Sequence, residues 1–209
     1  VNGGMAKNVE MNLKKLNVKV DIVTNHNWEN ITKTRFVDYQ TNHMFLRVDK
    51  NDSKIAKIQM PAFENIDFKK YDAVIVSDYN KGFLDENLLK KISLCHDTTF
   101  LDTKKLLGTW CREYSFIKIN NKEFNNTKHT LDNDLRSKII HTRGPIGSEY
   151  QGVLYPVPSV EVKDTSGAGD TFIAGLCYKY VKDGNIVEAI NFANECATKV
   201  VQKRGVTTA

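Results

Sequence analysis

The spacing of apolar residues predicts a helix followed by a strand at the start of the chain. Val9, Leu13 and Leu16 recur at helical spacing, so we expect a helix over about residues 6–16. In residues 18–23 apolar and polar positions alternate instead, which is the period of a strand with one buried face.

Two extended runs farther along the chain predict a β-hairpin. Residues 31–37 and 43–49 are rich in β-branched and aromatic side chains, and the polar residues 38–42 separate them. We expect this hairpin to be an antiparallel attachment to the main fold, either a lid or a small second sheet. An isolated hairpin is marginally stable in water, so it needs a partner surface.

From residue 71 onward strands and helices alternate, which predicts an α/β domain with a mainly parallel sheet. The first of these strands is a continuous apolar run, as expected of a strand covered on both faces. Asp85 is a candidate N-cap, and Gly184 and Gly205 are candidate helix stops. The expected strands span residues 73–77, 98–102, 115–119 and 138–142, and the expected helices span about residues 85–94, 169–182 and 186–203.

Composition and charge narrow the class of protein without selecting a function. The longest aliphatic run, residues 73–76, is far shorter than the ~20 residues of a membrane span, and the first residues lack a signal-peptide core. The net charge is +5, and the basic residues are scattered among acidic ones. We therefore expect no membrane or nucleic-acid partner and an anionic small-molecule substrate. Because the chain does not begin with methionine, we expect a processed, trimmed or incomplete product.

The four cysteines predict a reducing compartment. They form no C-x-x-C pair, and Cys177 and Cys196 fall in apolar helical patterns, where a thiol is usually a small core residue. We therefore expect a cytoplasmic protein without disulfides. The five histidines show no metal-binding spacing such as H-E-x-x-H.

The strongest chemical signal is the string D-T-S-G-A-G-D, which ends at Asp170 and leads directly into a predicted helix. Small residues let the backbone approach a ligand, and free N–H groups at a helix start attract an anion. The N–H groups of Gly167, Ala168 and Gly169 would hold a transferring phosphoryl group. Asp170 would act as the general base that accepts a hydroxyl proton. The alternative is a plain Gly-rich turn with an acidic residue in the favourable first turn of a helix.

This string resembles the signature of the ribokinase-like (PfkB) carbohydrate kinases. The resemblance implies a three-layer α/β sandwich with a mainly parallel sheet and a small antiparallel β lid. The segment G-G-M-A-K-N, from Gly3 to Asn8, is similar to the family's N-terminal segment that contacts the sugar. The resemblance therefore assigns Gly4 and Asn8 to substrate binding.

Two further segments match the family in the same order. Asn120 and Glu123 resemble its N-x-x-E element, which organises Mg²⁺ and phosphate and acts on the metal indirectly. The same pair also fits a plain helix cap. The segment T-R-G-P-I-G, from Thr142 to Gly147, resembles the family's nucleotide loop. The resemblance thus assigns Thr142, Gly144 and Gly147 to ATP binding.

Several stretches resemble one branch of the family, the bacterial heptose 7-phosphate kinases. They include an L-D-T-K segment in which Thr103 replaces the branch's proline, and a C-terminal segment that places Asn194 on the adenine side. The stretches are residues 31–37, 46–49, 77–82, 101–104, 192–194 and 203–207. The resemblance covers nearly all of the chain.

Six further polar residues are candidate contacts to a sugar phosphate. Arg35 and Arg47 on the predicted hairpin would hold a phosphate bidentately, or else face solvent. The other four lie at or just after strand ends, where α/β sheets bind ligands. The alternative is that they only form surface turns. These four residues are Asp78, Lys81, Asp102 and Lys104.

The chain also departs from the family pattern. The family's first strand, with its sugar-binding Asp, has no counterpart here, and a strand–helix block is missing between about Asn25 and Ile31. We therefore expect part of the sugar pocket, or an edge of the sheet, to be missing.

The resemblance implies an ATP- and Mg²⁺-dependent kinase that phosphorylates the anomeric hydroxyl of a heptose 7-phosphate and feeds ADP-heptose and lipopolysaccharide synthesis. It also implies a homodimer joined through the β lid. Two alternatives stay open: another sugar or nucleoside kinase of this family, and a degenerate, non-catalytic binding or assembly protein.

Overall fold

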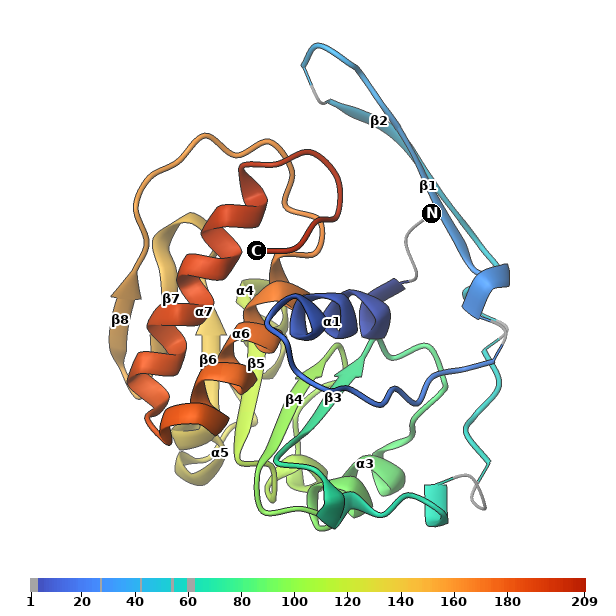
Figure 1. The fold of residues 1–209 in the computed structure, drawn as a ribbon, viewed down its shortest axis with the longest axis vertical. Helices are drawn as coiled ribbons and strands as arrows, with labels where there is room; N and C mark the ends of the chain where they lie inside the picture. The colour runs from blue at the N-terminus through green and yellow to red at the C-terminus, as the bar shows by residue number, and fades with distance from the viewer. Residues whose placement is uncertain (1–3, 27, 42, 54, 60–62) are drawn as a thin grey trace.

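A six-stranded sheet forms the middle layer of the molecule (Figure 1). The computed structural model describes residues 4–26, 28–41, 43–53, 55–59 and 63–209. The strands lie in sequence order across the sheet: β3 (Val74–Asp78), β4 (Thr99–Thr103), β5 (Phe116–Asn120), β6 (Ile139–Thr142), β7 (Gly147–Tyr150) and β8 (Val153–Pro156). The first four are parallel, and β7 and β8 continue the sheet antiparallel. The mainly parallel sheet is therefore confirmed.

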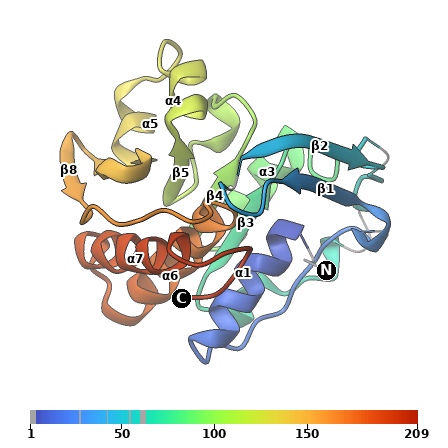
Figure 2. The same cartoon turned by 90° about the horizontal axis from the view of Figure 1, so that it is seen from above.

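Helices cover both faces of this sheet, which gives three layers (Figure 2). One face carries α1 (Gly4–Lys15), α6 (Ala168–Asp183) and α7 (Ile186–Val201), and the other carries α3 (Glu86–Ser93), α4 (Asn121–Thr127) and α5 (Asn133–Lys138). Short 3₁₀ turns lie at η1 (Trp28–Asn30), η2 (Phe68–Lys70), η3 (Thr109–Cys111) and η4 (Gly144–Ile146).

The strand pleat divides the core into two apolar clusters, one on each face. Phe100 packs with α1, α6 and α7, whereas its neighbour Leu101 packs with α3 on the other side. Phe116 and Ile117 divide between the two clusters in the same way. Successive strand side chains point to opposite faces, so a continuous apolar run supplies both clusters.

The predicted hairpin is present as a separate two-stranded antiparallel sheet. It consists of β1 (Thr32–Val37) and β2 (Met44–Lys50), and it extends away from the three-layer body (Figure 1). Asn42, in the predicted turn, lies outside the described residues. Phe45 is 70% exposed and Tyr39 is 82% exposed, so the outer part of the hairpin offers apolar surface to solvent.

The helix ends follow the local sequence signals with one exception. Asp85 caps α3 by accepting a hydrogen bond from the backbone N–H of Leu88. Gly184 ends α6 in the left-handed conformation, at φ 69°. The expected stop at Gly205 is wrong, because α7 ends at Val201 and Gly205 lies in the loop beyond it.

The strand expected over residues 18–23 is also wrong. The segment has no regular secondary structure, although Val18 and Val20 pack against the core. A strand requires a neighbour for its backbone hydrogen bonds, and β3 at the sheet edge pairs only with β4 among the described strands. The alternating pattern therefore reports one buried face but not a hydrogen-bonded strand.

The remaining sequence-based expectations concern the cysteines and the membrane. All four cysteines are free, and Cys177 and Cys196 are buried in the core as expected. No helix within the described residues is long and apolar enough to span a bilayer.

Candidate active site

A cleft of about 1650 Å³ opens beside the carboxyl ends of the parallel strands. Its walls come from the hairpin, the first turns of α1, the strand ends, the turn before α6, and α7. Sequence-predicted residues in its lining are Asn8, Arg35, Arg47, Asp78, Lys81, Lys104, Asn120, Thr142, Gly144, Gly147, Gly167, Ala168, Gly169, Asp170 and Asn194. The fold thus gathers most of the predicted site residues, from distant parts of the chain, around one space.

The Gly-rich turn before α6 leaves the start of that helix open toward the cleft. Gly167, at φ 83°, occupies the N-cap position, and no side chain among the described residues caps the helix. Val206 packs so closely that a Cβ on Gly167 would lie 3.0 Å from its Cγ1. Asp164 fixes the turn, because its carboxylate accepts hydrogen bonds from the N–H groups of Ser166 and Gly205. The uncapped N–H groups and the helix dipole together favour an anion here.

Asp170 lies in the first turn of α6 and is 3% exposed. Its Oδ2 accepts a hydrogen bond of 2.9 Å from Nδ2 of Asn8 on α1. Its Oδ1 has no hydrogen-bond partner within the part of the chain that the structure describes. Burial raises the pKa of Asp170 to about 7, against the lowering effect of the Asn8 hydrogen bond. A carboxyl group with such a pKa exchanges protons readily at neutral pH.

Behind this turn lies a buried ion pair that contains a residue missed from the sequence. Lys118 on β5 donates to Oδ2 of Asp102 on β4 at 2.8 Å, and both side chains are almost fully buried. Burial alone would lower the pKa of Lys118, but the charge and the hydrogen bond of Asp102, together with the charges of Glu123 and Asp170, outweigh it and the pKa is raised. Lysine is rarely buried without a charged partner. The position of Lys118 inside the apolar run F-I-K-I was therefore a sequence feature that could have indicated a buried ion pair.

Asp102 and Glu123 lie behind the cleft wall, where lysines neutralise them. Lys104 forms an ion pair with Glu123 and lies 3.8 Å from Oδ1 of Asp102. Asp102 is 2% exposed, is paired with Lys118 and is not among the described residues that line the cleft, so its contact with a sugar stays a prediction. Lys104 itself reaches the cleft and lies 5.1 Å from the ring centroid of Tyr79.

Asn120 and Glu123 form a complete capping box at the start of α4. The Asn120 side chain accepts from the Glu123 N–H at 3.0 Å, and Oε2 of Glu123 accepts from the Asn120 N–H at 2.8 Å. The helix-cap role considered from the sequence is therefore present. No cluster of three or more His, Cys, Asp or Glu that could hold a metal occurs within the described residues.

The predicted nucleotide loop is a tight turn between β6 and β7. Gly144 and Gly147 both have positive φ, at 61° and 112°. A Cβ on Gly147 would lie 2.1 Å from the carbonyl oxygen of Tyr155, so only glycine fits there. Asn194 on α7 binds both β7 and β8, accepting from the Ser148 hydroxyl and donating to the Tyr155 carbonyl.

On the hairpin side, two arginines face each other across the strands. Arg35 on β1 is the direct partner of Arg47 on β2, and both line the cleft. Arg47 makes two hydrogen bonds of 2.8 Å to Asp49, whereas Arg35 has no ion pair among the described residues. Like charges directly opposite each other destabilise a strand pair. A bound anion would relieve that repulsion.

The other expected sugar contacts are held by neighbouring groups. Lys81 lies 2.8 Å from Asp52 at the base of the hairpin. Asp78, at the end of β3, accepts hydrogen bonds from the Asn80 N–H and the Thr103 hydroxyl. Gly4 begins α1, and Gly3 lies outside the described residues.

Comparison with known families matches residues 3–209 to the pfkB family carbohydrate kinase. The chain belongs to this family. Curated relatives include the bifunctional protein HldE of Aliarcobacter butzleri, 31% identical over 96% of this chain and 48% of the relative, and that of Nitratiruptor sp., 31% identical over 81% of this chain and 41% of the relative. The chain thus spans less than half the length of these relatives.

The fold comparison agrees with the family. Ribokinase from Thermotoga maritima matches with a TM-score of 0.61 and 16% identity, covering 83% of this chain and 64% of that enzyme. Arabidopsis thaliana ribokinase, solved with ribose and ATP, matches with a TM-score of 0.60 and 17% identity, covering 84% of this chain and 64% of that enzyme. The chain therefore has the ribokinase-like fold expected from its sequence, and its family is one of kinases.

Proposed function

We propose that this chain transfers the γ-phosphoryl group of ATP to a hydroxyl group of a sugar phosphate. The observation that carries the proposal is Asp170: a buried carboxyl group with a pKa of about 7, one oxygen held by Asn8, and the other oxygen without a partner among the described residues. It lies in the first turn of a helix whose uncapped N–H groups attract an anion. A base beside an anion site is what phosphoryl transfer to a hydroxyl requires.

The positions of the residues in and around the cleft suggest a separate role for each of them in this reaction. Asp170 accepts the proton of the attacking hydroxyl, while Asn8 fixes the orientation of its carboxylate. The N–H groups at the start of α6 stabilise negative charge on the group being transferred. Gly147 and Asn194 belong to the nucleotide side of the cleft, as the family resemblance implies. Mg²⁺ would neutralise phosphate charge, with Asn120 and Glu123 acting on it indirectly.

A sugar phosphate is favoured over a neutral sugar by the hairpin. Arg35 and Arg47 face each other over the cleft, and Lys81 lies nearby. Arginine pairs bind phosphate oxygens in a bidentate geometry. The sequence resemblance to heptose 7-phosphate kinases, together with the HldE relatives, makes heptose 7-phosphate phosphorylated at its anomeric hydroxyl the substrate that we propose.

A turnover assay with ATP, Mg²⁺ and a panel of sugars and sugar phosphates tests the proposal. We expect ADP release with heptose 7-phosphate that exceeds the release with neutral sugars, and release from Asp170→Asn that is lower by roughly 10²–10⁴-fold or more. Folded protein that shows no nucleotide affinity in calorimetry would overturn the kinase assignment. Turnover with another sugar or a nucleoside would overturn only the proposed substrate.

A further inference from the structure

We infer that Lys118 binds the phosphoryl group during its transfer, as a cation placed behind the Gly-rich turn. The inference rests on the proposed function, since it names a further residue of that same site. Lys118 lies outside every motif that led to the family. It comes from β5, whereas the anion-binding N–H groups come from α6.

The first argument is the distance between Lys118 and the start of α6. A Cβ placed on Gly169 would lie 2.8 Å from Nζ of Lys118 and 3.8 Å from its Cε. Real Cβ atoms do not approach other atoms so closely, so the ammonium group occupies the space that a side chain at residue 169 would fill. Glycine at this position therefore leaves room for the ammonium group beside the backbone of the anion-binding turn.

The second argument is electrostatic. The start of a helix carries partial positive charge, so an ammonium group there is repelled in the absence of an anion. Asp102 supplies a counter-charge through Oδ2, 2.8 Å from Nζ, while its Oδ1 has no hydrogen-bond partner among the described residues. Lys118 also lines the cleft although its side chain is only 4% exposed. A phosphoryl group bound at the helix start would lie between two positive features and relieve their repulsion.

The competing interpretation is that Lys118 only neutralises Asp102 inside the protein. Removing one partner of a buried pair destabilises a protein by leaving a charge unpaired, whereas neutral replacement of both partners often does not. The two interpretations therefore predict different ATP affinities for a variant in which both Lys118 and Asp102 are replaced by neutral residues.

The test compares ATP and ADP affinities by calorimetry with Mg²⁺ present. In Lys118→Met we expect ATP binding to weaken by about ten- to a hundredfold, the range of a charge-assisted hydrogen bond. ADP binding should change by less than about threefold, because ADP lacks the phosphoryl group that is transferred. Lys90→Met, the same replacement on the exposed surface of α3, is the matched control and should leave both affinities unchanged.

The double variant Lys118→Met with Asp102→Asn separates binding from stability. We expect its melting temperature to return toward that of the parent, while the selective loss of ATP affinity persists. Recovery of the parent ATP-to-ADP ratio in the double variant would overturn the inference, as would an unchanged ratio in Lys118→Met. A parent protein that binds neither nucleotide would overturn the proposed function itself, and this inference with it.

Discussion

The carboxylate of Asp170 is held by a residue that lies far from it in the sequence. Asn8 donates to one oxygen, and burial in the first turn of α6 raises the pKa to about 7. The sequence string predicted a helix start with an acidic residue in its first turn, because both features depend on the local sequence. It did not reveal Lys118, because the approach of β5 to α6 is a tertiary contact.

Replacing Asp170 by Asn should separate chemistry from binding. The amide keeps the size of the side chain but does not accept a proton, so we expect phosphoryl transfer to fall by roughly 10²–10⁴-fold or more. Nucleotide affinity should hold or rise, since a negative charge beside the phosphates is removed. Single-turnover rates and calorimetry on one preparation measure both effects. An unchanged rate would exclude Asp170 as the base, and the melting temperature serves as the control for folding.

The raised pKa of Asp170 also predicts how stability depends on pH. Because its folded pKa, about 7, lies above the unfolded value near 3.8, the folded state binds the proton more tightly. This contribution is fully present below the unfolded pKa and is lost as pH rises through 7. We expect the free energy of unfolding of the parent to fall relative to Asp170→Asn between pH 5 and pH 8. Urea unfolding at several pH values measures this difference, and a constant difference would contradict it.

At the scale of elements, local sequence signals predicted where helices and strands lie better than they predicted whether a strand has a partner. The hairpin, the parallel strands and the long C-terminal helices appear close to their expected positions. The sequence did not indicate β7, β8 or α5, and it indicated α4 only through the possible helix cap at Asn120 and Glu123; all four are short elements of four to seven residues. Short segments carry too little periodicity to be recognised. The error at residues 18–23 has the opposite cause, since a clear pattern lacked a neighbouring strand.

The hairpin should contribute phosphate affinity through Arg35. Because Arg35 faces Arg47 and has no ion pair among the described residues, we expect Arg35→Met to raise the sugar-phosphate KM at least tenfold. ATP affinity should change little, since Arg35 lies on the hairpin side of the cleft. Steady-state kinetics with varied sugar phosphate measure the effect. Lys50→Met, a cation of β2 that does not line the cleft, is the matched control, and an equal effect there would indicate a general change of charge.

The two glycines of the turn between β6 and β7 differ in the space that each has for a side chain. A methyl group on Gly144 would point into open space, whereas a methyl group on Gly147 would overlap the Tyr155 carbonyl. We expect Gly144→Ala to cost about 1–2 kcal/mol for its left-handed conformation. Gly147→Ala should cost more, because the turn and β8 must also separate. Urea unfolding compares the two variants, and equal losses would contradict the predicted ranking.

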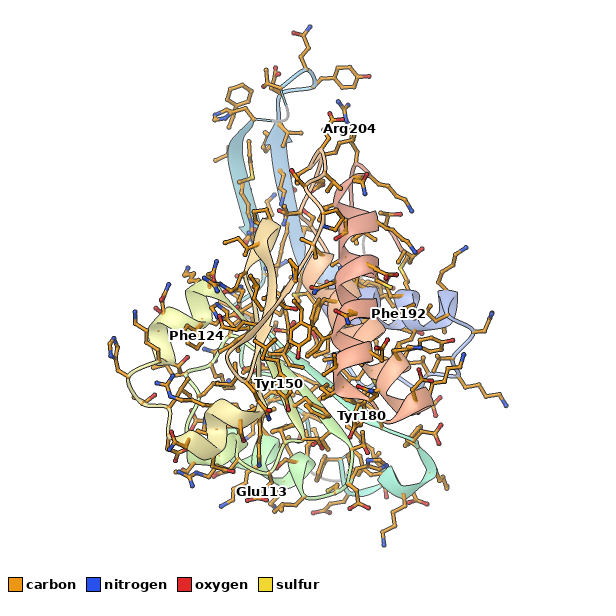
Figure 3. All side chains as sticks on the ribbon, turned by 90° about the vertical axis from the view of Figure 1, so that its left-hand side faces the viewer. Glu113, Phe124, Tyr150, Tyr180, Phe192 and Arg204 are labelled. Carbon is orange, nitrogen blue, oxygen red and sulfur yellow. The ribbon has the colours of Figure 1, made fainter. Side chains whose placement is uncertain are left out.

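At the scale of the whole molecule, the hairpin should join two chains. Its outer side chains include Phe36, Phe45 and Leu46, each more than half exposed, and apolar surface of this kind usually marks an interface. Within one chain, the guanidinium of Arg204, which follows α7, lies 5.2 Å from the ring centroid of Tyr39 on the hairpin. Arg204 is labelled in Figure 3.

We therefore expect a homodimer in light scattering, and a shift toward the monomer in the double variant Phe45→Ser, Leu46→Ser. Replacing Leu94 by Ser, an exposed apolar residue at the end of α3, is the control and should leave the dimer intact. A monomeric mass for the parent chain at working concentration would contradict the prediction.

The contact between Asn8 and Asp170 has a consequence for synthesis on the ribosome. The two residues are 162 positions apart, so at ~5–20 residues per second α6 emerges roughly 10–30 s after α1. During that interval the neighbouring strands from β3 to β6, which follow one another along the chain, are already available to pair, whereas the amphipathic α1 still lacks the helix against which it packs. The apolar face of α1 therefore has no α6 to pack against until residues 168–183 have been synthesised. A chaperone that binds such apolar faces would meet the nascent chain before Asp170, the proposed base, has been synthesised.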